Sequence, residues 1–243
     1  MTRLEFSNQF DTLVSSYRRF RDFDSREPLD TIEFDELEKS QFLTKAQEEL
    51  VLSLYNGKNS FGDSFEKTEE LRRYLSNLVM ESELEPITTS NGFPLGMESN
   101  SKFFTLPEDL WFITYESVIV NDGKCKGDTS LEVVPVRQDE YHKLRKNPFR
   151  GPNDRRALRL DLSEGNVEIV SKYTITKYYL RYLKKLQPIV LVDMPNDVSV
   201  NGVSEATECM LHEGLHQRIL EIAVDMALRS KLGGQASAAN RER

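Results

Sequence analysis

The sequence predicts an α+β fold, in which a helical bundle closed by a C-terminal helix carries an inserted antiparallel β-sandwich or small barrel. Three observations predict it. Apolar residues recur with helical spacing over residues 1–80, and the period changes to two between about residues 110 and 192. Helical spacing then returns over residues 208–232. Strands and helices do not alternate along the chain, so a parallel sheet is not expected.

The same observations predict the domain organisation. Residues 1–81 together with 203–232 are expected to form the helical bundle, and residues 82–202 the β-rich insertion. Gly233-Gly234 is predicted to end the last helix. Residues 233–243 then form a C-terminal tail, which is polar enough to be disordered on composition alone.

Three helices are expected before the β-rich insertion. The first has an apolar stripe of Phe6, Phe10, Leu13, Val14 and Tyr17. Residues 44–47 (TKAQ) match a capping box that would open the second helix, and Asn56-Gly57 should end it. The third is predicted to start at Thr68, with an apolar face of Leu71, Tyr74, Leu75 and Leu78.

Two hairpins are expected in the insertion, after a predicted loop over residues 82–102. The first joins strands 110–120 and 131–136 across Asn121-Asp122-Gly123, because Asp-Gly between two apolar runs is typical of a tight turn. The second joins 157–162 and 167–172 across residues 163–166. The remaining elements are a short helix at 141–146 and strands at 178–183, 189–192 and 197–202.

The distribution of charge limits the classes of function that this chain can have. The chain has 243 residues with a net charge of −8, but residues 1–100 carry −9 and residues 124–185 carry +7. Such a dipolar chain could attract copies of itself or place its basic belt against nucleic acid, although an unevenly charged solvated surface would look the same.

The cysteine content and the lengths of the apolar runs also limit the class of protein. Cys125 and Cys209 exclude a disulfide framework but not a single bond. There is no apolar run of about 20 residues and no apolar stretch at the start. A soluble protein made in a reducing cytoplasm is expected.

One catalytic motif is present. His212, Glu213 and His216 match HExxH, in which two histidines one helical turn apart bind zinc and the glutamate activates a bound water. This defines a first alternative function, a zinc-dependent metallopeptidase. Against it, no third ligand follows at a suitable spacing, and the other histidine is His142. Both motif histidines also border the apolar stripe of the last helix, so we expect no metal and no cofactor.

A second alternative is a nucleic-acid-binding module over residues 150–185. Aromatic and basic residues alternate over 177–185, as in a platform for single-stranded nucleic acid. An amphipathic strand that buries Tyr178, Leu180 and Tyr182 has the same pattern, and we favour it. A basic cluster, which could contact phosphates or an acidic neighbour, is formed by Arg150, Arg155, Arg156 and Arg159.

Five stretches of the chain resemble the tail ring or adaptor proteins of crAss-like bacteriophages. They are FDELEKSQFLTKAQEELVLSLYNGK (34–58), LPEDLWFITYESV (106–118), NPFRGPNDRRALRLD (147–161), YYLRYLKKLQPIVL (178–191) and ECMLHEGLHQRILEIAVDMAL (208–228). The layout is also similar to the tail tubular A, or gatekeeper, proteins and head-completion adaptors of short-tailed phages, which are helical bundles, often with a β insertion.

The resemblance implies a virion structural protein without enzymatic activity. It implies a homo-oligomeric ring of about a dozen copies that connects the portal to the tail and lines the DNA channel. The implied partners are the portal protein, neighbouring tail ring proteins and packaged DNA, the last without sequence-specific binding, and no membrane. The implied location is the tail or portal vertex of the virion, after assembly in the cytoplasm of the bacterial host. The family shares the helix pattern LHxxIL but not the preceding His-Glu, which makes HExxH a chance match.

The candidate interface is therefore sought in three places: the first hairpin, the basic cluster, and the C-terminal helix with its tail. The candidate interface residues are Asp122, Gly123, Arg150, Arg155, Arg156, Arg229, Lys231, Arg241 and Arg243. No catalytic residue is expected.

Overall fold

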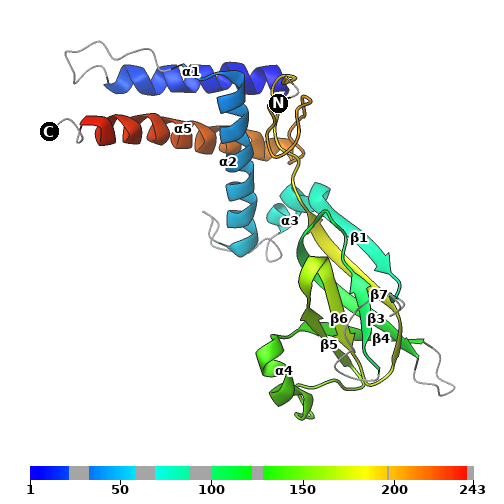
Figure 1. Ribbon diagram of the computed structural model, residues 1–243. Coiled ribbons are helices and arrows are strands. Elements are labelled where there is room, and N and C mark those ends of the chain that lie inside the picture. Colours follow the sequence, from blue (N-terminus) through cyan, green and yellow to red (C-terminus); the bar gives the residue numbers. More distant parts are fainter. Residues whose placement is uncertain (22–32, 58–68, 88–99, 122–127, 196, 240–243) are drawn as a thin grey trace. The chain divides into compact units, whose positions relative to one another are not determined.

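The computed structural model describes residues 1–21, 33–57, 69–87, 100–121, 128–195 and 197–239 (Figure 1). The chain divides into two compact units. Residues 1–77 and 186–243 form one, here called the helical unit, and residues 78–185 form the other, here called the β unit. Residues 186–202, which the sequence assigns to the insertion, are part of the helical unit. The α+β class is confirmed.

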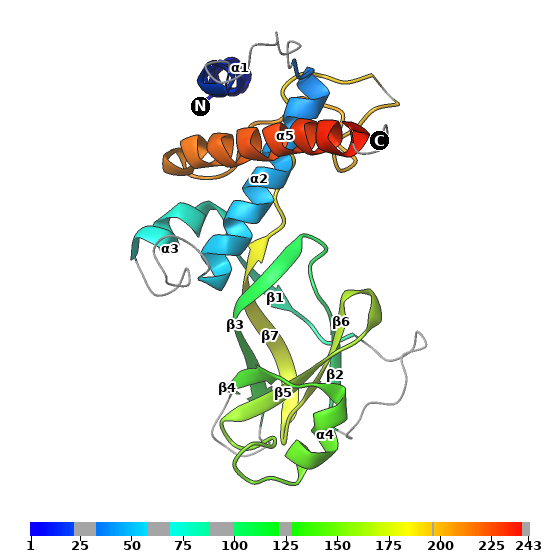
Figure 2. The ribbon, with the colours of Figure 1, turned by 90° about the vertical axis from the view of Figure 1, so that its left-hand side faces the viewer.

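The helical unit is built from crossing helices. Its elements are α1 (Arg3–Arg21), α2 (Glu36–Asn56), α3 (Glu69–Leu75), the short 3₁₀ helix η4 (Glu213–Leu215) and α5 (His216–Ala239). The helix α5 packs against both α1 and α2. Figures 1 and 2 both show α2 crossing α5, so the helices do not run parallel as in a regular bundle.

The apolar stripe of α1 faces the core as expected. Phe6, Phe10 and Val14 are buried, whereas Tyr17 is exposed. Phe10 packs edge-to-face on Phe34, with 5.6 Å between the ring centroids. Spacing alone therefore predicted this helix and its buried side.

The start of α2 differs from the prediction, and its end is confirmed. The capping box is formed by Asp35, which accepts a hydrogen bond from the Glu38 amide at 2.6 Å, while the Glu38 carboxylate accepts one from the Asp35 amide at 3.3 Å. Gly57, with φ of 71°, ends the helix in the left-handed conformation. Thr44 lies inside the helix and is buried, so it is not a cap.

Three polar side chains of α2 bind the main chain of residues 187–191 instead. Ser40 Oγ accepts a hydrogen bond from the Leu191 amide at 3.1 Å, and Thr44 Oγ1 accepts one from the Ile189 amide at 3.0 Å. The Gln47 side-chain amide donates to the Gln187 carbonyl at 2.6 Å. We call these three residues the α2 polar ladder. It satisfies buried main-chain groups that a strand partner would otherwise satisfy.

The predicted strand at 189–192 is not observed because its main chain bonds to α2, and the strand predicted at 197–202 is not observed in the described chain either. Each has only one isolated bridge, Val190 with Thr207 and Val200 with Val203. The last helix also differs from its expected bounds, since α5 begins at His216 and runs through Gly233-Gly234 to Ala239. Two glycines cost a helix about 1 kcal/mol each, which the following alanines, good helix formers, partly offset.

The β unit is a single curled sheet. Its strands are β1 (Val79–Leu84), β2 (Lys102–Thr105), β3 (Leu110–Asn121), β4 (Asp128–Pro135), β5 (Arg156–Asp161), β6 (Asn166–Val170) and β7 (Thr174–Lys184). The strand order is β1-β7-β3-β4-β5-β6-β2, and all neighbours are antiparallel except β4 with β5. One curled sheet of seven strands is observed where the sequence predicted an antiparallel β-sandwich or a small barrel.

Curling brings the two ends of the sheet together. Just after β1, the amide of Ile87 donates to the carbonyl of Phe103 in β2 at 2.8 Å. The concave side holds a core that includes Phe104, Val118 and Tyr178. In the described residues this single bond, rather than a full ladder, joins the sheet ends.

Both predicted strand pairings are confirmed, as β3–β4 and β5–β6, whereas the turn predicted at Asp122-Gly123 lies outside the described residues. The strands β1 and β2 overlap only the two ends of the loop predicted over 82–102, at residues 82–84 and 102, and residues 88–99 of that loop lie outside the described residues. Both strands are short, and pairing with β7 and β6 determines their conformation. The predicted short helix is α4 (Gln138–Arg145), which lies beside β5 in Figure 1 and buries Tyr141 against Leu158 and Leu160.

No helix among the described residues combines the length and the apolarity needed to cross a membrane.

Substitution of Thr44 tests the polar ladder. Thr44→Val keeps the side-chain shape but leaves the buried Ile189 amide without an acceptor, which should lower the free energy of unfolding by about 1–3 kcal/mol. Thr44→Ser retains the hydroxyl and is the matched control. Urea unfolding followed by circular dichroism measures both. Equal stability of the Val and Ser variants would contradict this role.

Candidate assembly interface

The HExxH segment does not lie on one helix. His212 precedes the 3₁₀ helix η4 with an extended backbone (φ −59°, ψ 141°), and its Nδ1 accepts a hydrogen bond from the Gly214 amide at 3.1 Å. The helix α5 starts only at His216. The expected geometry, with both imidazoles on one helical face, is therefore wrong for this segment.

His216 serves packing between α1 and α5. Its ring is buried, with Nε2 3.0 Å from the Leu211 carbonyl oxygen and Nδ1 2.8 Å from the Met1 nitrogen. The ring centroid lies 5.3 Å from that of Phe6. Burial lowers the pKa of His216, and the hydrogen bond to Leu211 opposes this only in part. Within the described residues, no three His, Cys, Asp or Glu side chains converge as a metal site would require.

The aromatic and basic strand is confirmed as an amphipathic strand. In β7 the side chains of Tyr178, Leu180 and Tyr182 are buried. On the opposite side, Arg181 Nε lies 2.8 Å from a Glu81 carboxylate oxygen, and Lys177 forms an ion pair with Glu83. These two cations of β7 are therefore paired with β1.

The predicted basic cluster is divided between core and surface. Arg159 is buried, and its Nη1 donates to Glu116 Oε2 at 2.8 Å. The Tyr178 hydroxyl donates to the same oxygen at 2.6 Å. Burial raises the pKa of Glu116, and the charge of Arg159 and the hydrogen bond from Tyr178 oppose that rise. Arg159 thus belongs to a buried ionic group and not to a surface.

The other members of the cluster lie at the surface or near it. Arg156 Nη1 donates to the Phe149 carbonyl at 3.3 Å. Arg150 and Arg155 are exposed, and no ion pair to either is found in the part of the chain that the structure describes. They remain available to an acidic neighbour.

The C-terminal candidates contact their own subunit. Arg229 forms an ion pair with Asp225, one turn earlier on α5, at 2.8 Å. Lys231 Nζ lies 3.1 Å from Glu38 of α2 and 5.2 Å from the Phe34 ring centroid. Asp122, Gly123, Arg241 and Arg243 lie outside the described residues, as does Cys125, and Cys209 is a free thiol.

The structure contains a hydrogen-bonded loop with an exposed aromatic residue that the sequence did not predict. Phe149 is 84% exposed. Asn147 Oδ1 accepts hydrogen bonds from the amides of Phe149 and Arg150 at 2.9 and 3.2 Å. At Gly151 a Cβ would lie 2.8 Å from the Asn147 and Leu144 carbonyl oxygens, so only glycine fits. We call residues 146–151 the Phe149 loop; its Pro-Phe-Arg-Gly sequence, an aromatic residue within a turn, is the signal that could have revealed it.

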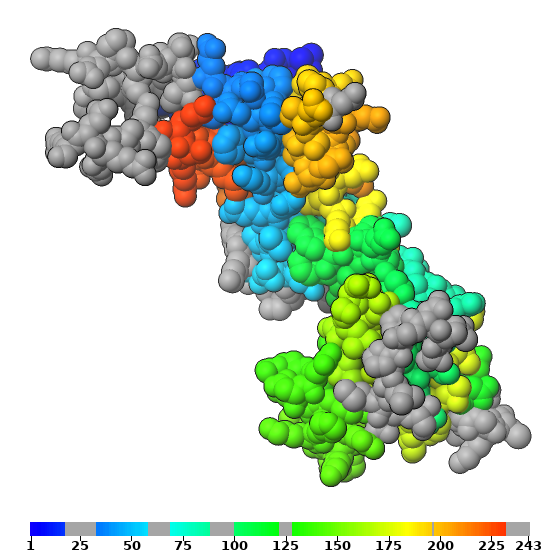
Figure 3. All heavy atoms as spheres, in the orientation of Figure 1, coloured from blue at the N-terminus to red at the C-terminus, as the bar shows by residue number. Residues whose placement is uncertain are grey.

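A surface depression in the helical unit was also missed. It has a volume of about 610 Å³ and is lined by residues 2–4 and 7, the start of α2 at Glu36, residues 191–193 and Glu208. Figure 3 shows α2 in blue beside the yellow and orange segment that follows the β unit. Two exposed apolar side chains, Leu4 (71% exposed) and Val192 (45% exposed), lie among the carboxylates of Glu36, Asp193 and Glu208. We call this site the α1 depression.

The buried His216 should make the helical unit sensitive to acid. Because its pKa is lowered on folding, the unfolded chain binds the proton first as the pH falls through about 6.5. The free energy of unfolding should therefore decrease between pH 7 and 5, and less so in His216→Gln. Denaturation at several pH values measures this. His142→Gln changes an exposed histidine and is the control; an unchanged pH dependence in His216→Gln would contradict the assignment.

Comparisons with known proteins identify the family. Residues 1–241 match the family model described as phage tail ring protein 3/4. The chain is 44% identical over 234 residues to Ring protein 3 of Bacteroides phage crAss001, covering 95% of this chain and 96% of the relative. It is 29% identical over 232 residues to Ring protein 4/5 of the same phage, covering 92% and 90%. The resemblance to crAss-like tail ring proteins is thus confirmed, and the chain belongs to the phage tail ring protein 3/4 family.

Proposed function

We propose that this chain is the subunit of a homo-oligomeric ring of about a dozen copies that connects the portal to the tail and lines the DNA channel. The observation that carries the proposal is that similarity to a ring protein extends over 95% of the chain. Both units are therefore common to the two proteins, and neither is an addition with a separate function.

The two relatives suggest a position in the tail. Identity to Ring protein 3 is 44% and identity to Ring protein 4/5 is 29%, although both belong to one phage. We assign this chain to the position of Ring protein 3. A phage that encodes two related ring proteins can stack rings of one fold, so a neighbouring ring of related subunits is the expected partner.

The distribution of charge supports repeated contacts between copies. The helical unit contains 24 acidic and 16 basic residues, whereas the β unit contains 16 of each. The whole net charge of −8 thus belongs to the helical unit. A ring repeats one heterologous contact, in which two different surfaces meet around an axis. A net acidic subunit also lets DNA pass without tight binding.

Electron cryo-microscopy of purified virions tests the proposal. The expected result is density for this chain in a closed ring on the tail axis, in contact with the portal or another ring and surrounding the channel. The map would also give the copy number. A chain that is absent from the virion, or that lies outside an axial ring, would overturn the proposal.

Deletion of residues 233–243 tests the assignment of contacts between rings to the end of the chain. The buried residues of α5 whose side chains the structure describes, which include Ile219, Leu220, Ala223, Val224 and Ala227, precede the deleted segment. The truncated subunit should therefore unfold at nearly the same temperature as the full chain and yet fail to support tail assembly. Complementation of a phage that lacks the intact gene measures assembly. Tailed particles in normal yield would contradict this assignment.

A further inference from the structure

We propose that the Phe149 loop of one subunit inserts into the α1 depression of a second copy, and that this contact anchors the interface between neighbours in the ring. The inference rests on the proposed homo-oligomeric ring and names the surfaces that meet. The loop belongs to the β unit and the depression to the helical unit, so the contact is heterologous, as ring closure requires.

The Phe149 side chain has the properties of a binding anchor. At 84% exposure, it leaves more of its surface in water than any other large hydrophobic residue of the described chain. Burial of a phenylalanine side chain is worth about 1.5–3 kcal/mol. Aromatic side chains held in a fixed position are common centres of protein interfaces, because little conformational freedom is lost on binding.

The hydrogen bonds of the loop fix the main chain that carries this side chain before any partner binds. Two amides bond to Asn147 Oδ1, and the Gly151 amide bonds to the Asn147 carbonyl at 2.7 Å. Arg156 also binds the Phe149 carbonyl. These hydrogen bonds thus fix the main chain of the loop, while the ring of Phe149 remains exposed to solvent.

The surroundings of Phe149 are cationic. Lys146, Arg150 and Arg155 are exposed, and none of them takes part in an ion pair within the described residues. A complementary surface should therefore be apolar at its centre and acidic around it.

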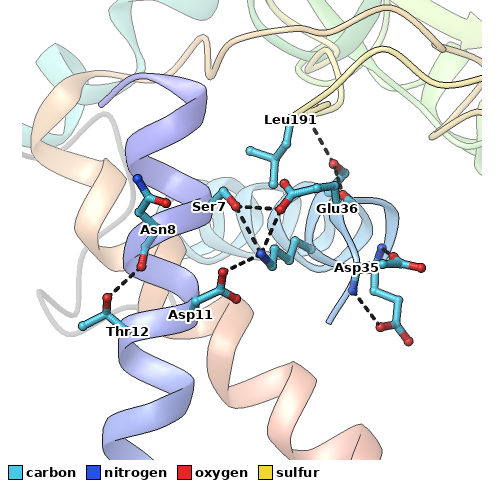
Figure 4. Close-up of polar contacts among 10 residues, drawn as sticks. Ser7, Asn8, Asp11, Thr12, Asp35, Glu36 and Leu191 are labelled. Atoms are coloured by element: carbon cyan, nitrogen blue, oxygen red, sulfur yellow. Dashed lines mark hydrogen bonds and ion pairs between the residues drawn. The ribbon is translucent and has the colours of Figure 1, made fainter. Parts of the chain in front are cut away.

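The α1 depression has this composition. Leu4 and Val192 supply apolar surface, and the lining also holds three carboxylates and the cation Arg3; of the carboxylates, Glu36 is paired with Lys39. Glu36 is held in place, since it accepts hydrogen bonds from Ser7 at 2.8 Å and Lys39 at 2.9 Å. Figure 4 shows Ser7, Asp11 and Glu36 directed toward one another from α1 and α2. Asp193 is fixed as well, because it accepts the Ala206 amide at 2.8 Å.

Charge and shape favour a second copy over DNA as the occupant. The phosphates of DNA would pair with the three cations, but phosphates would then also face the apolar side chain of Phe149. The depression offers apolar side chains and carboxylates together, and an acidic depression repels DNA. Since every copy carries both surfaces, each can bind one neighbour on each side.

Photo-crosslinking in assembled particles tests the contact directly. p-Benzoylphenylalanine replaces Phe149, and purified virions are irradiated. The expected product has twice the mass of the chain and joins position 149 to residues 2–7, Glu36, residues 191–193 or Glu208 of a second copy. A crosslink to DNA, to another protein, within one chain or to a different surface would overturn the inference, as would the absence of any crosslinked dimer.

Charge reversal provides an independent second test in the intact phage. Arg150→Glu and Glu208→Lys should each lower the yield of tailed particles by about tenfold or more, and the two changes together should restore much of it, because attraction is re-established across the interface. Lys45→Glu makes the same charge change on an exposed part of α2 and should have little effect. A double variant no better than the single ones would overturn the inference.

These outcomes separate the inference from the proposed function. Density for an axial ring, together with the absence of a crosslink from position 149 to the depression, would leave the ring function in place and disprove only this contact. The absence of the chain from an axial ring would disprove the function itself.

Discussion

The helical unit depends on the hydrogen bonds of the α2 polar ladder. Ser40, Thr44 and Gln47 are spaced along one side of α2, and they bind main-chain groups of Leu191, Ile189 and Gln187 in antiparallel order. From Ser40 to Thr44 the helix advances about 6 Å, and the two extended residues from Leu191 to Ile189 span about 6.6 Å, so these spacings nearly match; the step from Thr44 to Gln47 is shorter, about 4.5 Å. The ladder bonds residues 187–191, which follow the β unit in sequence, to α2, which precedes it. These bonds hold together the two sequence segments of the helical unit.

Each unit also contains a buried ionic group. In the helical unit, burial acts to lower the pKa of Lys39, but its bonds to Asp11 and Glu36 outweigh this and raise the pKa. The β unit has Glu116 with Arg159. Loss of one partner leaves the other as an unpaired buried charge. Such groups therefore strongly destabilise incorrect packing, even where they add little net stability to the native fold.

The sequence could predict features that depend on local periodicity or turn chemistry. The stripe of α1, the end of α2 at Gly57 and both hairpins belong to this class. Features set by distant contacts could not be predicted. Thr44 and Gln47 carry the spacing of a capping box, but residues 187–191, distant in sequence, determine their role. The surface site was missed for the same reason: a phenylalanine in sequence predicts a core residue, and only the fold shows that Phe149 is exposed.

Polar motifs and exposed apolar residues have opposite roles in this chain. His216, Arg159 and Tyr178, which motif analysis singled out, bind groups inside their own unit. Phe149 and Leu4 match no motif, yet they leave apolar surface in water, which association can cover. Polar groups that pair within their own unit stabilise the fold, whereas exposed apolar side chains gain free energy when another surface covers them. In the proposed ring, neighbouring copies would supply that surface.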